Sequence, residues 1–242
     1  HNNATDVSPR LDAMAAQGLR FTRGYSNSSV CSPTRFALAT GRWQYRLRGA
    51  AEEPIASVHG DKVLGLPPDH PTVASLLRDA GYATALVGKW HLGYPPHFGP
   101  RLSGYEEFYG FHAGGADYFA HCDPRGRPDF WRNEEPHTED GYLTDLLSRR
   151  AVDFVKRQTA KQPFYLSLHY SAPHWPWLTR EDRAESERLQ GMAMDAEPSL
   201  ILCEHAALDA SRLLRDGLTL ASLPALASVQ DLEAQAPRAW QP

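Results

Sequence analysis

Two helix–strand units, recognisable from the spacing of apolar residues, constrain the fold of this chain more than any other feature. The pattern predicts a helix over 72–81 that leads into a short apolar strand over 82–87. It predicts a second amphipathic helix over about 144–158, followed by an apolar strand over 164–170. Strands that alternate with amphipathic helices indicate an α/β domain, with a mostly parallel central sheet and helices on both of its faces.

The N-terminal part of the chain adds two more expected helices, with a short strand and a serine-rich loop between them. The first helix is expected over 9–18, where a proline suits the first turn and a glycine suits the exit. Residues 19–21 then alternate apolar and polar, as in a short strand. The second helix, over 33–41, would place Cys31 beside its positive end, where an anion is stabilised.

Two stretches, 43–71 and 93–137, interrupt this rhythm and are expected to be loops because they hold many Gly and Pro residues. A long irregular stretch in a compact domain usually lines a site. The tail over 180–242 begins charged and continues rich in Ala, Leu and Ser, with no further strand–helix rhythm. We expect this tail to be helical or poorly ordered.

Basic side chains follow both strands of the predicted sheet. Lys89 and His91 come directly after the first strand, and His174 comes shortly after the second. Ligands of open parallel sheets collect at the carboxyl ends of the strands, so these three residues are expected to converge. Lys89 and His91 alternate along an extended chain, so that both can face one pocket. His169 lies within the second strand and is expected to be a packed core histidine.

The chain has three cysteines, and Cys31 differs from the other two in its surroundings. A cysteine at a helix N-terminus, with Arg35 one turn further on, favours a thiolate or a bound oxyanion. A lone cysteine in a turn would more often be an ordinary thiol. Cys122 and Cys203 are expected to be ordinary thiols, because their spacing fits neither a zinc site nor a disulfide framework.

Charge and hydropathy exclude two classes of partner. The formal net charge is −4, which gives no basic footprint for nucleic acid and no polybasic patch for a membrane surface. No apolar run reaches the roughly 18 residues that a membrane-spanning helix needs. Neither nucleic acid nor membrane is therefore expected as a partner.

Two sequence runs, in a fixed order, carry a resemblance to the type I sulfatases. The run Cys-Ser-Pro-Thr-Arg at 31–35, followed by Thr-Gly-Arg at 40–42, resembles the signature C-x-P-x-R of that family. The segment 81–93 resembles its second signature, G-Y-x-T-x-x-x-G-K-x-H. The Pro-His-Trp-Pro run at 173–176 is similar to the H-x-P context of a further family histidine. The resemblance covers roughly residues 8–179.

The resemblance implies a sulfuric ester hydrolase, similar to arylsulfatases, with the fold of the alkaline phosphatase superfamily. In that family a maturation enzyme, either formylglycine-generating or anaerobic, oxidises the signature cysteine to formylglycine (3-oxoalanine). The nucleophile expected here is therefore the hydrated aldehyde, a gem-diol, made from Cys31. It would attack the sulfur of a sulfate ester substrate.

The resemblance also implies roles for the other motif residues. Arg35 is expected to steady the hydrated aldehyde, and His91 to help with its second hydroxyl. Lys89 and His174 are expected to bind the substrate at its sulfate or leaving oxygen. A histidine near its free pKa of about 6.5 suits the transfer of the leaving-group proton. Aryl sulfates, sulfated sugars and glycosaminoglycans all remain open as substrates.

Calcium is the metal cofactor that the resemblance implies, with Cys31 as formylglycine among its ligands. The family's other ligands are a paired aspartate near the N-terminus and a later Asp-Asn pair. Asp6 stands alone, and no Asp-Asn occurs in the chain, so those ligands are not present. We therefore expect an incomplete catalytic domain over 1–179, an N-terminal fragment, followed by the atypical tail 180–242. The family's compartments are periplasmic, secreted or lysosomal.

Three other functions remain open from the sequence. A phosphonate or phosphate monoester hydrolase of the same superfamily would use a similar scaffold, and fold alone does not decide between the two. A sulfate-binding remnant without turnover would fit the missing metal ligands. A cysteine protease, pairing Cys31 with His91 or His174, is the weakest alternative because Arg35 suits an oxyanion better than a peptide.

Overall fold

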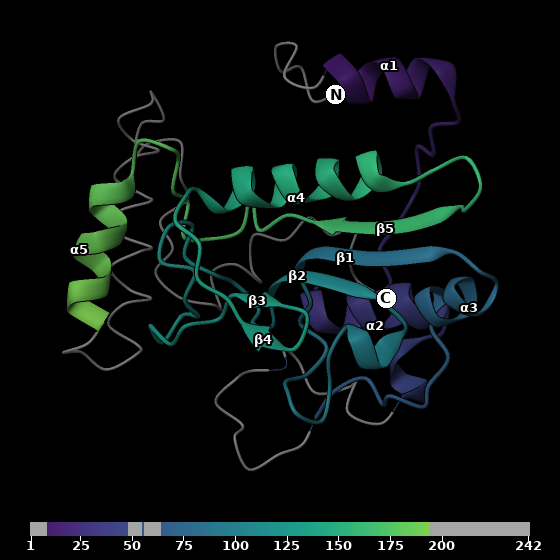
Figure 1. Ribbon diagram of the computed structural model, residues 1–242, viewed down its shortest axis with the longest axis horizontal. Coiled ribbons are helices and arrows are strands. Elements are labelled where there is room, and N and C mark those ends of the chain that lie inside the picture. Colours follow the sequence, from purple (N-terminus) through teal and green to yellow (C-terminus); the bar gives the residue numbers. More distant parts are fainter. Residues whose placement is uncertain (1–8, 48–54, 56–63, 194–242) are drawn as a thin grey trace, which may run out of the picture.

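The central strand of the sheet is β1 (Ala83–Lys89), which is buried along nearly its whole length. It lies between β2 (Glu107–Phe111) and β5 (Phe164–His169), and both neighbours run parallel to it. The carboxyl ends of these three strands therefore meet at one edge of the sheet. The structure, a computed structural model, describes residues 9–47, 55 and 64–193 (Figure 1).

Two short antiparallel strands extend the sheet on the side of β2. They are β3 (Trp131–Arg132) and β4 (Glu135–Pro136), and the order across the sheet is β4-β3-β2-β1-β5. The predicted mostly parallel sheet is confirmed for the three longer strands. The stretch 93–137, expected to be irregular, is corrected, because it contributes β2, β3 and β4 between its loops.

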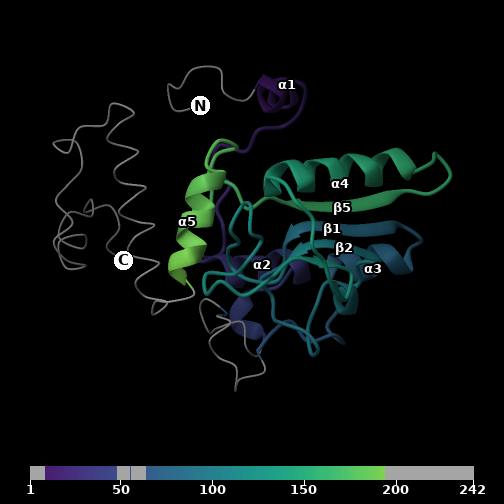
Figure 2. The same cartoon turned by 60° about the vertical axis from the view of Figure 1, so that its left-hand side comes forward.

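Helices cover both faces of the sheet, as predicted (Figures 1 and 2). On one face lie α2 (Cys31–Thr40) and α3 (Val73–Asp79), and on the other lies α4 (Leu143–Arg157). Successive β1 residues point to opposite faces, so Leu86 packs in the core on the α2 and α3 side while Val87 packs on the α4 side. The residues that α4 buries form one stripe: Leu143, Leu146, Leu147, Ala151 and Phe154.

Backbone segments approach closely where β1 passes between its two neighbours. Gly88 pairs with Gly110 on one side and with His169 on the other. A methyl group at Gly88 would lie 1.9 Å from the carbonyl oxygen of His169, and one at Gly110 would lie 2.0 Å from the carbonyl oxygen of Gly88. Gly88 also has a φ of 111°, a region that favours glycine. Both positions therefore require glycine.

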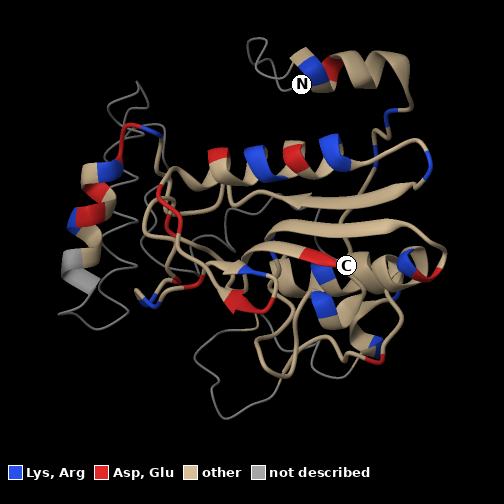
Figure 3. Ribbon diagram, in the orientation of Figure 1, with Lys and Arg blue, Asp and Glu red and all other residues tan. Residues whose placement is uncertain are grey.

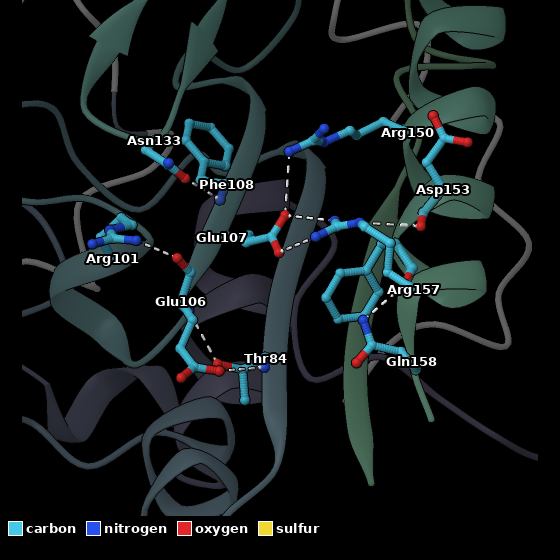
Figure 4. A network of polar contacts seen from close by, with 11 residues as sticks. Thr84, Arg101, Glu106, Glu107, Phe108, Asn133, Arg150, Asp153, Arg157 and Gln158 are labelled. Atoms are coloured by element: carbon cyan, nitrogen blue, oxygen red, sulfur yellow. Dashed lines mark hydrogen bonds and ion pairs between the residues drawn. The ribbon is translucent and has the colours of Figure 1, made fainter. Parts of the chain in front are cut away.

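A charged cluster joins α4 to the sheet (Figure 4). Glu107 of β2 accepts two hydrogen bonds from Arg157, at 3.0 and 2.9 Å, and one from Arg150 at 3.2 Å. These contacts hold the pKa of Glu107 below its usual value, mainly through the Arg157 hydrogen bond. Basic and acidic residues alternate along α4 rather than forming one patch (Figure 3).

The remaining helices lie outside the sheet layers. Two short 3-10 helices span Gln44–Arg46 and Arg101–Ser103. Helix α1 (Pro9–Gln17) forms as predicted but buries none of its residues. The strand expected at 19–21 is absent from the structure, and the side chains there are exposed because no neighbouring strand pairs with them. Among the described helices, none combines the length and the apolar character needed to cross a bilayer.

The start of the C-terminal tail is helical and anchored to the rest of the fold. Helix α5 (Arg183–Ala193) contributes Ser186, whose Oγ donates to Asp117 at 2.6 Å, and Leu189, which is buried. The expectation that the whole tail is helical or poorly ordered stays a prediction. Residues 194–242, and with them Cys203, lie outside the described residues.

Candidate functional site

Cys31 is the first residue of α2, and its thiol is half-buried and free of any disulfide. The residue at the helix N-cap, Val30, adds no capping side-chain hydrogen bond. The helix ends at Gly41, whose left-handed φ of 66° lets its N–H donate to the carbonyl oxygen of Ala37. The predicted position of Cys31 at the positive end of a helix is confirmed, and this position favours an anion.

Arg35 lies one turn into α2 and connects the helix to the carboxyl ends of the strands. Its Nη1 donates to the backbone carbonyl oxygen of Lys89 at 3.0 Å and lies 3.0 Å from Nδ1 of His169. Burial lowers the pKa of Arg35, and the nearby Cys31 opposes this shift. The guanidinium still stays charged, because its ordinary pKa is far above neutral.

Lys89 is the last residue of β1 and is 3% exposed. Its Nζ donates to the carbonyl oxygen of Gly114. The pKa of Lys89 is lowered to about 8, mainly by burial and also by the charge of Arg35, while Cys31 opposes this shift through charge and a side-chain hydrogen bond. Lys89 is therefore mostly a charged ammonium at neutral pH. It lies close enough to Cys31 to contact an anion that binds at that residue.

His91 reaches the same region, but not along an extended chain. Its φ of 57° is left-handed, so the predicted extended conformation is wrong at this residue. The Nε2 of His91 lies 2.8 Å from the carbonyl oxygen of Ile55, which can only accept, so Nε2 carries the hydrogen. Its Nδ1 is buried, with no hydrogen-bond partner among the described residues. Burial, and then the charge of Lys89, lower the pKa of His91 to about 3.

His174 follows β5 in a loop that fixes its ring. Its Nδ1 donates to the carbonyl oxygen of Trp175 at 2.8 Å, which leaves Nε2 as the unprotonated nitrogen. Its backbone carbonyl accepts from the hydroxyl of Tyr118 at 2.9 Å. Burial lowers the pKa of His174, and Lys89 and Arg35 lower it further. Neither candidate histidine therefore keeps the free pKa that the sequence analysis expected.

A small-residue turn after β2 closes the site opposite β1, and the sequence analysis did not single it out. A methyl group at Gly114 would lie 2.7 Å from Cε1 of His91, and one at Gly115 would lie 3.1 Å from Cε1 of His174. Both rings therefore pack directly against the turn. The only local signal in the sequence is the run Ala-Gly-Gly-Ala at 113–116 within a stretch expected to line a site.

Asp129 holds this turn in place from behind. The buried carboxylate accepts the backbone N–H of His112 at 3.1 Å, the backbone N–H of Ala113 at 2.7 Å and the indole N–H of Trp131 at 2.8 Å. Burial raises the pKa of Asp129, and the three hydrogen bonds oppose this shift. Asp129 could not be selected from the sequence, because nothing near it in the chain identifies its partners.

His169 is not the packed core histidine that the sequence analysis expected. It is the last residue of β5 and half-buried, and its Nδ1 lies 3.0 Å from Nη1 of Arg35 and 3.1 Å from the carbonyl oxygen of Lys89. Burial, and then Arg35, lower the pKa of His169 to about 4. A histidine in a predicted strand can face the core or a site at the end of the sheet, and His169 faces the site.

The donors around Cys31 do not fit calcium. Calcium prefers six to eight oxygen ligands, several of them carboxylates. The side chains gathered here are a guanidinium, an ammonium and imidazoles. The first two are positively charged and repel a metal cation, and imidazoles offer nitrogen rather than the oxygen that calcium prefers. Within residues 9–47, 55 and 64–193, no group of three or more His, Cys, Asp or Glu side chains is placed to hold a metal ion.

The residues selected from sequence thus come together at one edge of the sheet. Cys31 and Arg35 come from α2, Lys89 and His91 from β1 and its continuation, and His174 from the loop after β5. A family model described as Sulfatase matches residues 1–214. The chain belongs to the sulfatase family. Cys122, in contrast, is buried away from these groups, and burial raises the pKa of its thiol to about 12.

Relatives of this sulfatase chain include enzymes named for sulfated amino sugars. It is 36% identical to human N-acetylgalactosamine-6-sulfatase, in a match that covers 70% of this chain and 35% of the relative. It is 29% identical to N-acetylglucosamine-6-O-sulfatase of Bacteroides thetaiotaomicron, over 71% of this chain and 27% of the relative. The chain thus spans about a third of the length of the curated relatives it matches.

Two solved structures share the fold. The structure of Ps i-CgsB in complex with k-i-k-neocarrahexaose matches with a TM-score of 0.63 and 32% identity, over 74% of this chain and 43% of that one. The structure of BT4656 with D-glucosamine-2-N,6-O-disulfate matches with a TM-score of 0.56 and 27% identity, over 70% of this chain and 30% of that one. The predicted sulfatase-like α/β fold, present in part, is confirmed.

Proposed function

We propose that this chain carries the anion-binding half of a sulfuric ester hydrolase, with a nucleophile made from Cys31. The observation that carries the proposal is the placement of Arg35 and Lys89 close to a free, half-buried thiol at a helix N-terminus. Two cations and a helix dipole that meet at one point favour a group with several anionic oxygens. A sulfate ester is such a group.

Residue 31 is proposed to act as formylglycine. Once hydrated, this aldehyde carries two hydroxyl groups on one carbon, which neither cysteine nor serine offers. The half-buried thiol of Cys31 is compatible with access by a maturation enzyme. Arg35 and Lys89 would hold the sulfuryl oxygens and neutralise the charge that develops on them in the transition state. The N–H groups at the start of α2 would add to that stabilisation.

The two histidines are proposed to be neutral imidazoles before substrate binds. His91 presents an unprotonated Nδ1, which can accept a hydrogen bond, or a proton, from a hydroxyl at position 31. His174 keeps an unprotonated Nε2, and its ring is close enough to Lys89 and Arg35 for their charges to lower its pKa. A bound sulfate group would offset the charges of Lys89 and Arg35, so it would raise the pKa of both histidines. His174 could then donate a proton to the leaving oxygen.

Calcium remains a proposal drawn from the family alone. Because the described residues offer no suitable oxygen donors, no step here depends on a metal. The activity of the whole protein is likewise a proposal, since the chain spans only part of its relatives. We propose that residues 1–179 carry this site and that residues 180–242 do not contribute to it.

Sulfated sugars are the proposed substrate class. The relatives named above act on 6-sulfated amino sugars by name, and the two solved structures hold k-i-k-neocarrahexaose and D-glucosamine-2-N,6-O-disulfate. A cationic site at the end of a parallel sheet can receive a sulfate group while the sugar stays outside. Aryl sulfates remain useful as chromogenic probes of the same bond.

The test combines maturation with turnover. The full chain and its Cys31→Ala variant would be produced with and without a formylglycine-generating enzyme, and peptide mass spectrometry would identify the group at residue 31. We expect the aldehyde only in the wild-type chain made with that enzyme. An unmodified thiol in every preparation would remove the proposed nucleophile.

Turnover of an aryl sulfate, an aryl phosphonate and a 6-sulfated amino sugar would then be compared, with and without calcium. We expect sulfate esters to be preferred. A preference for the phosphonate would assign the chain to the related hydrolases of the superfamily.

A sulfate-binding protein without turnover is the second candidate, and the nitrogen-rich donor set around Cys31 favours it. Calorimetric titration with inorganic sulfate separates the two candidates. Saturable binding together with no hydrolysis by the aldehyde form would support this second function, whereas hydrolysis at any calcium concentration would exclude it.

A further inference from the structure

Three polar atoms from three segments meet behind the candidate anion site. The Nη1 of Arg35 lies 3.0 Å from the carbonyl oxygen of Lys89 and 3.0 Å from Nδ1 of His169. The Nδ1 of His169 itself lies 3.1 Å from that carbonyl oxygen. One nitrogen of a guanidinium therefore faces two other polar atoms at hydrogen-bond distance.

The chemistry of the three groups decides which atom donates. A guanidinium has only N–H donors, and each terminal nitrogen carries two of them. A carbonyl oxygen can only accept, so one N–H of Arg35 points to Lys89 and the other can point to His169. This requires a lone pair on Nδ1 of His169 and places its hydrogen on Nε2. In the alternative tautomer, a hydrogen on Nδ1 would be donated to the Lys89 carbonyl oxygen at 3.1 Å, and the 3.0 Å approach of Nδ1 to Nη1 of Arg35 would bring two donors together without a hydrogen bond.

The surroundings of Arg35 make this contact important for its orientation. Within the described part of the chain, Lys89 and His169 are the two partners to which its side chain hydrogen-bonds. A cavity beside the guanidinium is lined mainly by apolar and aromatic side chains, including Leu86, Trp90 and Tyr105. These side chains offer few hydrogen-bond acceptors that could orient the guanidinium. With Nη1 fixed by two acceptors, the remaining N–H groups of Arg35 keep one direction.

We propose that His169 is a positioning residue, which accepts a hydrogen bond from Arg35 and fixes the guanidinium in the orientation that serves an anion at Cys31. This inference rests on the proposed function for its consequence, because the anion is the sulfate group. The contact itself rests on the geometry of the folded chain. Burial and Arg35 also keep His169 neutral, as an acceptor must be.

The test uses two substitutions of equal size. His169→Asn places a carbonyl oxygen near the position of Nδ1, whereas His169→Leu has the same shape without an acceptor. Both are made in the full chain, and thermal unfolding monitored by circular dichroism establishes that each is folded. The readouts are the histidine tautomer from long-range nitrogen-15 NMR, the exchange of the Arg35 side-chain N–H signals, and the dissociation constant for inorganic sulfate.

In the wild-type chain we expect the Nε2–H tautomer at His169. In both the wild-type chain and His169→Asn we expect slowly exchanging Arg35 N–H signals. In His169→Leu those signals should exchange fast, and sulfate should bind about 10-fold more weakly, while His169→Asn stays within about 2-fold of wild type. An Nδ1–H tautomer, or equal effects of the two substitutions on either readout, would overturn the proposal.

The two proposals fail in different ways. If sulfate bound none of the three proteins, the proposed function would fall. The tautomer and the Arg35 N–H exchange would still decide whether His169 positions Arg35.

Discussion

Asp129 accepts a hydrogen bond from the backbone N–H of Ala113 at 2.7 Å, and this contact fixes the backbone of the turn after β2. The turn that it holds continues into Gly114, whose carbonyl oxygen receives Nζ of Lys89. The lysine is therefore positioned by a carboxylate that it does not touch. This chain of contacts explains how a cation at the end of β1 keeps its direction while it is almost fully buried.

Replacing Asp129 by Asn should loosen this turn, because an amide presents an N–H where the carboxylate accepts one. We expect the free energy of unfolding to fall by about 1–3 kcal/mol. We also expect sulfate affinity to fall by about 5-fold or more, measured by calorimetry, because Lys89 loses a fixed partner. Asp123→Asn is the matched control, since this buried carboxylate accepts from Arg127 instead. It should lose stability only, and equal losses of affinity would contradict the argument.

Lys89→Met should remove one of the two cations beside Cys31 with little change in side-chain volume. We expect inorganic sulfate to bind more weakly by about 10- to 100-fold, as for the loss of a charge-assisted hydrogen bond in a buried site. Lys161→Met changes an exposed lysine and should leave the affinity unchanged. Similar sulfate affinity in both variants would place the anion elsewhere.

Gly88→Ala should be far more harmful than Gly81→Ala, although both glycines have positive φ, of 111° and 91° respectively. A methyl group at Gly81 would meet nothing within 4 Å, whereas one at Gly88 would meet the His169 carbonyl at 1.9 Å. We expect about 1–2 kcal/mol for the strain at Gly81 and failure to fold, or a loss above about 4 kcal/mol, at Gly88. Soluble yield and chemical denaturation measure both.

His112 gives a prediction about acid stability. Its ring lies between Phe108 and Trp131, with both ring centroids 5.1 Å away, and burial lowers its pKa to about 3. An ordinary unfolded histidine, with a pKa near 6.5, binds more protons than this one between those two values. The free energy of unfolding should therefore decrease as pH falls below about 6.5.

His112→Phe removes that proton-binding difference while keeping a ring in the slot. Between pH 7.5 and 4.5 the variant should lose about 2 kcal/mol less stability than the wild-type chain, as measured by urea unfolding at each pH. The same pH dependence in the two proteins would show that His112 is already accessible to protons in the folded state.

Periodicity predicted the parts of the fold in which one element buries a continuous stripe. The helix expected over about 144–158 is α4, and the strand expected over 82–87 is β1. The segment of β2 gave no such signal, because Glu107–Phe111 is short and lies in a stretch rich in Gly and aromatic residues. Residues 19–21 show the opposite error, where local alternation was not matched by a neighbouring strand.

The site was predictable to the extent that its residues stand at strand ends or in motifs. Lys89 and His174 could be brought together from the rule for parallel strands, without any structure. Asp129 and Gly114 could not, because their contacts join residues far apart in the chain and leave no local pattern. His169 was misjudged because a strand residue's position does not reveal which neighbour it faces.

The parallel pairing of β1 with β5 has a consequence for how the chain acquires its structure. Ala83 pairs with Phe164, so β1 cannot pair with β5 until about 80 further residues have left the ribosome. Contacts of such long separation give a high contact order, which slows folding. During synthesis one edge of β1 would stay open, and a chaperone that shields exposed strands would find its substrate there.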